Sequence, residues 1–322
     1  MICASPVRID EVALIIQALF YLSIFPGLLF QFLCGWAFEW LDRKLIARFQ
    51  RRVGPPWYQP LADWIKLISK EDILPRGSNA VVITLLAIIS LGSVLTAGIY
   101  VPVAGFSPIG FEGDLIVVLF LLSVPTLAYY LVGMASVGIY SILGGSRSIL
   151  QYFSYEVPLL LALSGPAIMG ESWSIQEIMA AQIEMGPFIL FQPLGLILAI
   201  VGLIGKLKRD PLDIPKAKSE VVAGPLTEIT GLKLAFWQLT MNIQEVVGIF
   251  LIVNLYMSWS NSVNPWLAAL IFTLECLAMV VILSITSAIF ARLRIDQLAG
   301  LGWKILVPLA MLQLSAVILM GI

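Results

Sequence analysis

The stretch KLKRDPLDIPKAKSEVVAGPLTEITGLK, residues 206–233, is the most informative segment of this chain of 322 residues. It is rich in lysines and carboxylates although it lies between two strongly apolar segments, in a chain of which only 12% is charged. Pro211 and Pro215 interrupt its first half, and in the second half hydrophobic and acidic residues share one short segment, SEVVAGPLTE. We expect a structured polar loop that folds back and places carboxylates near a buried cavity. The alternative is a solvated loop whose lysines only set the topology.

The composition predicts an all-α polytopic membrane protein. The chain is 60% hydrophobic, its mean hydropathy is +0.97, and a soluble domain of this length cannot bury so much apolar surface. The formal net charge of −1 gives no reason to expect nucleic-acid binding. Because histidine is absent and Cys3, Cys34 and Cys276 are far apart, we expect this chain alone to bind no metal ion such as zinc, no haem and no iron–sulfur cluster.

Long apolar runs predict eight transmembrane helices in one integral membrane domain, 1–322. The predicted spans are approximately 12–40, 80–101, 115–140, 152–169, 188–205, 234–259, 266–290 and 303–321. The first run is too long for a signal-peptide core, so we expect a retained, tilted helix. The two long polar loops are 41–79 and 206–233, the second between helices five and six.

The basic residues predict the orientation of these helices. All but one of the 19 Lys and Arg residues fall on alternate loops, which include 41–79 and 206–233. The opposite loops, 102–114, 170–187 and 260–265, contain none. The positive-inside rule therefore predicts both termini outside a plasma or inner membrane, with the two long loops in the cytoplasm.

The first of these loops contains a predicted amphipathic helix in the membrane interface. In LADWIKLISKE, Leu61, Trp64, Ile65 and Ile68 share one face at helical spacing. A lipid-surface anchor is one interpretation, and a docking platform for a soluble partner is the other. The candidate docking residues, also candidates for the wall of a cavity, are Arg43, Arg48, Gln50, Arg51, Arg52, Lys216 and Lys218.

Three carboxylates, Glu156, Glu245 and Glu275, fall within predicted spans. A charge at mid-bilayer costs about 3 kcal/mol or more, so such residues normally face a polar interior and mark ion or proton paths. These three carboxylates are therefore candidates for a proton or ion path. Glu39 is expected only to stabilise a helix end or pair with a cation.

Several long motifs resemble one family. The run ARFQRRVGPP and the later QPLADWIKLISKE resemble the first cytoplasmic loop of the NADH dehydrogenase subunit 1 family of respiratory complex I, whose bacterial members are the H subunits. Ser154–Glu156 (SYE) resembles its fourth-helix motif, and PLDIPKAKSEVVAGPLTEITG its signature loop. The compact GPPWYQPLAD and the GPLTE sequence are closer to the connector subunit of ion-translocating membrane-bound [NiFe]-hydrogenases and their sulfur-reducing relatives.

The resemblance implies a non-catalytic connector in an oxidoreductase complex that translocates protons or sodium ions. It also implies that Asp42, Asp63, Asp213, Glu220 and Glu228 belong to the same proton or ion path as Glu156, Glu245 and Glu275. Its implied partners are a cytoplasmic iron–sulfur small subunit, a [NiFe]-hydrogenase-like large subunit and antiporter-like membrane subunits, so the iron–sulfur clusters and any Ni–Fe centre belong to the partners. The family loop commonly has acids where this chain has Lys216 and Lys218, which disfavours a bound quinone. Two alternatives remain: a quinone-binding subunit of a complex I-like dehydrogenase, and a stand-alone ion-coupled transporter.

Overall fold

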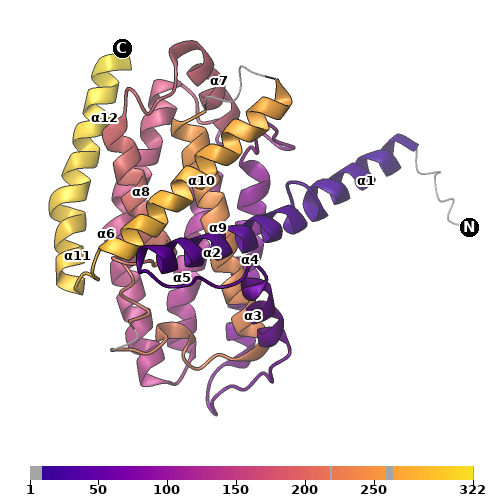
Figure 1. Ribbon diagram of the computed structural model, residues 1–322, viewed down its shortest axis with the longest axis vertical. Coiled ribbons are helices and arrows are strands. Elements are labelled where there is room, and N and C mark those ends of the chain that lie inside the picture. Colours follow the sequence, from indigo (N-terminus) through magenta and orange to yellow (C-terminus); the bar gives the residue numbers. More distant parts are fainter. Residues whose placement is uncertain (1–8, 218–219, 259–263, 322) are drawn as a thin grey trace, which may run out of the picture.

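The computed structural model describes residues 9–217, 220–258 and 264–321, and helices dominate that part of the chain (Figure 1). The described residues contain no named strand, only an isolated bridge between Val103 and Phe106. Most helices run along the long axis of the bundle, and α2 (Leu28–Phe49) and α10 (Pro265–Ile289) cross it at a steep tilt (Figure 1). The predicted all-α class is confirmed.

The first predicted span is broken into two helices. α1 (Ile9–Ser23) and α2 replace the single helix predicted over 12–40, and α1 projects away from the body of the protein (Figure 1). Pro26 has no N–H to donate, and Gly27 packs closely against the preceding turn. The helical hydrogen-bond ladder is therefore interrupted between α1 and α2. Sequence periodicity did not reveal this break, because the residues on both sides are uniformly apolar.

The loop predicted over 41–79 is shorter than expected, because α2 continues to Phe49. Arg43 pairs with Glu39 one helical turn earlier, so these charged side chains support the helix rather than end it. The following α3 (Gln59–Ile68) confirms the predicted amphipathic helix.

Only part of the predicted apolar face of α3 packs onto the protein. Trp64 lies against the ring of Phe32, with ring centroids 5.1 Å apart, and its Nε1 donates a hydrogen bond to the Ala235 carbonyl at 3.3 Å. Ile65 and Ile68 remain exposed. The helix therefore covers the bundle with one edge and presents apolar side chains outward with the other, as an interfacial helix does.

The middle of the chain forms an antiparallel trio of helices. α4 (Ala80–Tyr100) and α5 (Asp114–Ala135) agree with the predicted spans in this region, except that α5 ends before residue 140. α6 (Ile139–Met169) begins almost at once, so the polar loop predicted around 141–151 was wrong, and the fourth span, predicted over 152–169, begins earlier.

Small residues let the helical segment after residue 138 pack closely against its neighbours. A Cβ on Gly144 would meet the Gly224 Cα at 2.6 Å, and one on Gly133 would meet the Gly145 Cα at 3.0 Å. α6 therefore approaches its neighbours closely enough to bury its polar side chains. Ser141, for example, donates to the Pro225 carbonyl at 2.8 Å.

The remaining elements complete the bundle. In chain order they are α7 (Ile175–Met185), α8 (Pro193–Leu207), the 3-10 turn Gly224–Leu226, α9 (Gly231–Tyr256), α10, α11 (Ile295–Leu301), the π-helical turn Gly302–Leu306 and α12 (Val307–Gly321). α7 occupies a segment that was predicted to be a loop, 170–187. Helices with shifted ends occupy the other predicted spans.

Six helical segments in the described part of the chain are long and apolar enough to cross a membrane. They are Ile16–Phe49, Ala80–Tyr100, Asp114–Ala135, Gly231–Tyr256, Pro265–Ile289 and Ile295–Leu319. The two other predicted spans correspond to α6, which carries Arg147 and Glu156, and to α8, which has 15 residues. The structure therefore supports a membrane protein without confirming the count of eight.

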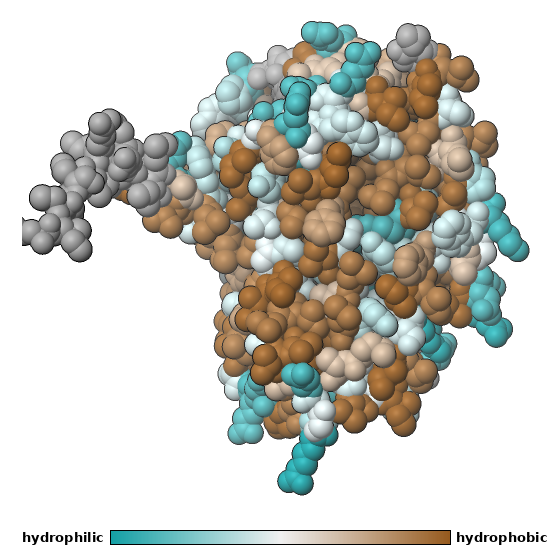
Figure 2. Space-filling view, turned by 180° about the vertical axis from the view of Figure 1, so that it is seen from behind, coloured by the Kyte–Doolittle hydropathy of each residue, from teal (hydrophilic) through white to brown (hydrophobic). Residues whose placement is uncertain are grey.

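The surface agrees with this membrane assignment. Figure 2 shows hydrophobic residues over most of one face, with hydrophilic residues gathered mainly toward its two ends and along one edge. Side chains such as Phe120, Leu131 and Phe153, on α5 and α6, are largely exposed. An apolar band of this kind is what a lipid-facing surface requires.

Candidate functional site

The centre of the site is a buried ion pair between Glu156 on α6 and Lys206 on α8. Lys206 Nζ lies 2.8 Å from Glu156 Oε1, and the Lys206 and Glu156 side chains are 2% and 4% exposed, respectively. Ser123 on α5 donates to the same oxygen at 2.6 Å. A buried carboxylate is tolerated when it has such partners. Side chains from three helices therefore hold together at this carboxylate, which was predicted from the sequence to belong to the ion path.

Close helix packing brings these groups together. Gly205 precedes Lys206, and a Cβ at Gly205 would lie 2.8 Å from the ring of Tyr155. The Gly205 carbonyl also accepts a hydrogen bond from the Gln151 side chain at 2.8 Å. The small residue lets α8 lie directly on α6, so that the next side chain reaches Glu156.

A second buried cluster surrounds Arg209, at the start of the 206–233 loop. Its guanidinium lies 3.1 Å from Asp42 Oδ1 on α2 and 2.6 Å from Glu245 Oε2 on α9. Ser284 on α10 donates to Asp42 at 2.7 Å. Burial opposes the charge, but the two carboxylates outweigh it and raise the pKa of Arg209 above its ordinary value. One arginine thus connects the loop to two helices.

Glu39 extends this cluster toward α3. Arg43 forms ion pairs with Glu39 and with Asp63, the second at 2.9 Å. Asn242 on α9 donates to Glu39 Oε2 at 2.5 Å. Burial raises the pKa of Asp63, but hydrogen bonds from Arg43 and Gln59 outweigh this effect and hold it below its usual value. Glu39 thus pairs with a cation, as expected, and in addition connects α2 to α9.

The charged side chains line a cavity of about 260 Å³ beneath the loop. Its ionisable lining residues are Glu39, Asp42, Arg43, Lys208, Arg209, Lys216 and Glu245. The walls come from α2, α9 and the first part of the 206–233 loop. Asp42, Arg43, Lys216 and Glu245 were predicted from the sequence as path or docking residues.

Two lysines of the loop face this cavity without the bridging contacts that Arg209 makes. Lys208 is 6% exposed, and its Nζ lies 4.5 Å from the centroid of the Tyr129 ring. Lys216 Nζ lies 3.0 Å from Met241 Sδ. Burial lowers the pKa of Lys208 to about 7 and also lowers the pKa of Lys216. Burial raises the pKa of Asp213 nearby in the loop.

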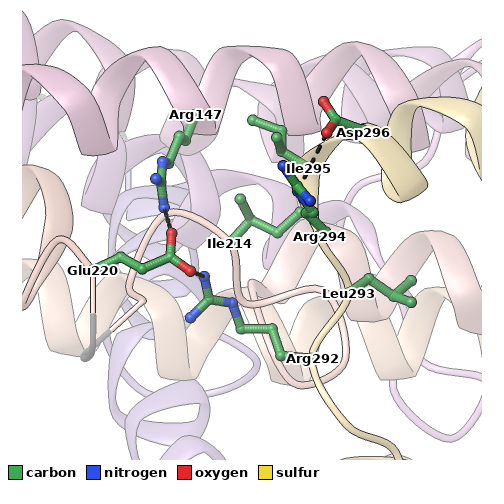
Figure 3. Close-up of a pocket in the computed structure, with 8 residues that line it drawn as sticks. All are labelled: Arg147, Ile214, Glu220, Arg292, Leu293, Arg294, Ile295 and Asp296. Atoms are coloured by element: carbon green, nitrogen blue, oxygen red, sulfur yellow. Dashed lines mark hydrogen bonds and ion pairs between the residues drawn. The ribbon is translucent and has the colours of Figure 1, made fainter.

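A separate charged region lies at the surface. Figure 3 shows Glu220 between Arg147, from α6, and Arg292, from the segment before α11. These residues border an open hollow of about 740 Å³, which also contains the exposed pair formed by Arg294 and Asp296. The hydrogen bond and charge of Arg147 hold the pKa of Glu220 below its usual value.

The other predicted site residues lie apart from the two buried clusters. Glu228 packs against Gly138 at the start of α6, where a carboxylate suits the helix dipole. Glu275 lies partly buried on α10, next to Cys276. The group at the end of α2 consists of Arg48, Gln50, Arg51 and Arg52, all of which are exposed. Lys218 lies outside the described residues.

Sequence reasoning missed the cationic partners of the path. Lys206, Lys208 and Arg209 were interpreted only as part of a charged loop, although they hold or face the carboxylates. Their spacing after an apolar helix was the available signal. The part of the chain that the structure describes contains no cluster of three or more His, Cys, Asp or Glu residues suited to a metal ion.

Comparisons with known proteins identify the family. The family model described as NADH dehydrogenase matches residues 22–318. The H subunit of the NADH-quinone oxidoreductase of Dehalococcoides mccartyi is 35% identical over 309 residues, covering 93% of this chain and 85% of that protein. The protein of the same name from Thermomicrobium roseum is 34% identical over 305 residues, covering 86% and 88%.

A solved structure agrees with both the motifs and the fold. A chain in the structure of the membrane-bound sulfane sulfur reductase, an archaeal respiratory membrane complex, matches with a TM-score of 0.85 and 27% identity. The match covers 95% of this chain and 99% of that one. The resemblance to the H subunits and to sulfur-reducing relatives is thereby confirmed, and the chain belongs to the NADH dehydrogenase subunit 1 family of respiratory membrane proteins.

Proposed function

We propose that this chain is the connector of a respiratory complex, which couples redox chemistry in a docked iron–sulfur partner to translocation of protons or sodium ions. The partner reaction is reduction of protons or of sulfur species. The observation that carries the proposal is the Arg209 bridge from the 206–233 loop to Asp42 and Glu245. A change in the loop next to a docked partner would act directly on carboxylates of two helices.

The buried ion pair between Lys206 and Glu156 supports the same role. Lys206, three residues before Arg209, holds Glu156 deeper in the bundle. Displacement of one short segment therefore alters the electrostatic surroundings of two separate groups of carboxylates. Because buried charges interact strongly through a medium of low polarity, small movements have large effects on where a proton or cation is stable.

The proposed topology places the loop on the side of the partner. It has eight spans, counting α6 and α8, with both termini outside and the 206–233 loop in the cytoplasm, as the distribution of basic residues favours. Arg48, Arg51 and Arg52 then supply a basic docking surface beside α3, for the partner's small and large subunits. Antiporter-like subunits adjoin the bundle within the membrane.

A quinone-binding role is the second candidate, favoured by the names of the curated relatives, which are quinone oxidoreductase subunits. The cavity supports it less well. Small-molecule pockets usually measure about 300–1,000 Å³ and are mainly apolar, whereas this one measures about 260 Å³ and has seven ionisable side chains in its wall. Inhibition of the assembled complex by quinone analogues, competitive with an added quinone, would favour the second role.

Substitution of Glu156 tests the connector role. We expect Glu156→Gln, in the assembled complex in sealed vesicles, to lower the number of ions moved per electron by about tenfold or more, because the buried carboxylate can no longer exchange charge. Glu112→Gln, at an exposed position between α4 and α5, is the matched control. Wild-type ion movement in Glu156→Gln, measured with a pH- or sodium-sensitive dye, would refute the role.

A further inference from the structure

Lys208 is a buried amine in an unusual setting. Lys206 and Arg209, on either side of it, bind carboxylates within 3.1 Å. Among the ion pairs that the described residues form, none includes Lys208; its Nζ instead contacts the face of the Tyr129 ring. At 6% exposure, an ammonium group with no carboxylate beside it is costly.

The backbone aims Lys208 differently from its neighbours. It has φ 53° and ψ 49°, the left-handed conformation, which is uncommon for a residue other than glycine. The turn directs Lys206 into the bundle toward Glu156 and Arg209 toward Asp42, while Lys208 lines the cavity. Lys208 therefore lines the cavity two residues after the lysine of the deep ion pair.

The surroundings of Lys208 favour neither protonation state strongly. Burial, Lys216 and Lys206 disfavour the cation, whereas Asp213 and Glu156 favour it, so that its pKa falls to about 7. The electron-rich face of Tyr129 also favours the cation. The other charged groups facing the shared cavity are Glu39, Asp42, Arg43, Arg209 and Glu245.

The buried Glu156–Lys206 pair contains a potential proton acceptor, the second carboxylate oxygen of Glu156. Lys206 and Ser123 both contact Glu156 Oε1. The other oxygen, Oε2, is buried and receives no hydrogen bond from the described residues. A carboxylate oxygen without a donor is a ready proton acceptor.

We propose that Lys208 carries protons between the cavity and the Glu156–Lys206 pair. A proton from the cavity forms a new N–H bond at the neutral Nζ, and release breaks that bond and forms an O–H bond at Glu156. No electrons are exchanged and no further reactant is needed. This inference rests on the proposed coupling function and assigns a carrier within it.

Two substitutions of Lys208 separate a carrier from a structural cation. Arginine keeps the charge over Tyr129 but does not release its proton in proteins, and methionine removes the charge. In vesicles containing the assembled complex, we expect Lys208→Arg and Lys208→Met each to lower proton movement per electron by about tenfold or more. Full activity of Lys208→Arg would overturn the inference, since a structural cation is replaceable by arginine.

Lys44 provides the matched control, because its Nζ also lies over an aromatic ring, 4.7 Å from the centroid of Trp40, but it does not line the cavity. Lys44→Arg and Lys44→Met should leave proton movement unchanged. If Glu156→Gln abolishes ion movement while Lys208→Arg retains it, the carrier is wrong and the connector function stands. If Glu156→Gln also has no effect, the connector function itself fails.

A third variant keeps the lysine and needs only a pH profile. Tyr129→Leu removes the ring face that favours the protonated amine, so the pKa of Lys208 should fall. We expect the alkaline limb of the profile of proton movement to shift by about half a pH unit toward acid. An unchanged profile in a complex that assembles normally, judged by co-purification of its subunits, would contradict the carrier role.

Discussion

The 206–233 loop meets the bundle in two places with opposite surroundings. At its start, Lys206 and Glu156 form an ion pair with side chains 2% and 4% exposed. In its second half, Glu220 is 50% exposed and pairs with Arg147 and Arg292 at the surface. Both contacts join the loop to α6. The comparison teaches that burial, rather than the number of ion pairs, decides how much stability is lost when one charged partner is removed.

The largest expected difference concerns the buried end. Lys206→Met leaves Glu156 without its cation, which should destabilise the protein by about 3–5 kcal/mol. Adding Glu156→Gln removes the unpaired charge, so the double variant should recover most of that loss. Thermal unfolding in detergent, followed by tryptophan fluorescence, measures both. A Lys206→Met protein as stable as the wild type would break the contrast between the two ends.

Arg209 should show an intermediate effect, because its side chain is 19% exposed and holds two carboxylates. Lysine keeps the charge but lacks the planar fork that reaches both Asp42 and Glu245. We expect Arg209→Lys to lose about 2 kcal/mol of stability, the value of a hydrogen bond to a charged group. Arg51→Lys, at an exposed position, is the control. Equal stability of the two variants would show that the bridge contributes nothing.

The smallest effect is expected at the surface end. Glu220→Gln should leave the global unfolding temperature unchanged, because exposed ion pairs contribute little. The change should be local: faster amide exchange in the segment 290–296, once Arg292 is released from the loop. Slower exchange in that segment, or a clear fall in unfolding temperature, would show that this contact is stronger than its exposure indicates.

The same contact has a predictable pH dependence. The pKa of Glu220 is lowered in the folded protein, so its unfolded form takes up a proton first as the pH falls. The stabilising contribution is therefore complete above the ordinary carboxyl pKa and disappears as the pH falls through the lowered one. Amide exchange in 290–296, corrected for its intrinsic rate, should increase over that range in the wild type and stay constant in Glu220→Gln.

The sequence predicted the class of the protein and the acidic half of its site. Apolar runs, the distribution of basic residues and the loop motifs were local signals, and they sufficed for the membrane fold, the amphipathic α3 and the family. The carboxylates Glu156, Glu245 and Glu275 were selected because acids at membrane depth are rare. Their interpretation needed no knowledge of packing.

The partners of those acids depended on packing and were not predictable in the same way. The contact of Lys206 with Glu156 joins positions 50 apart in the sequence, and it depends on glycines that let α8 approach α6. The polar start of α6 was mistaken for a loop because it packs against the 206–233 loop, where Ser141 donates a hydrogen bond to the Pro225 carbonyl. Such pairing is decided in three dimensions.

Ion movement by the double variant Lys206→Met/Glu156→Gln tests the central claim most directly, because this protein should fold and assemble while lacking the buried charges. We expect vesicles of the assembled complex to retain electron transfer, whereas the number of ions moved per electron should fall by about tenfold or more. Wild-type ion movement per electron in this stable variant would contradict the claim that the buried pair couples redox chemistry to transport.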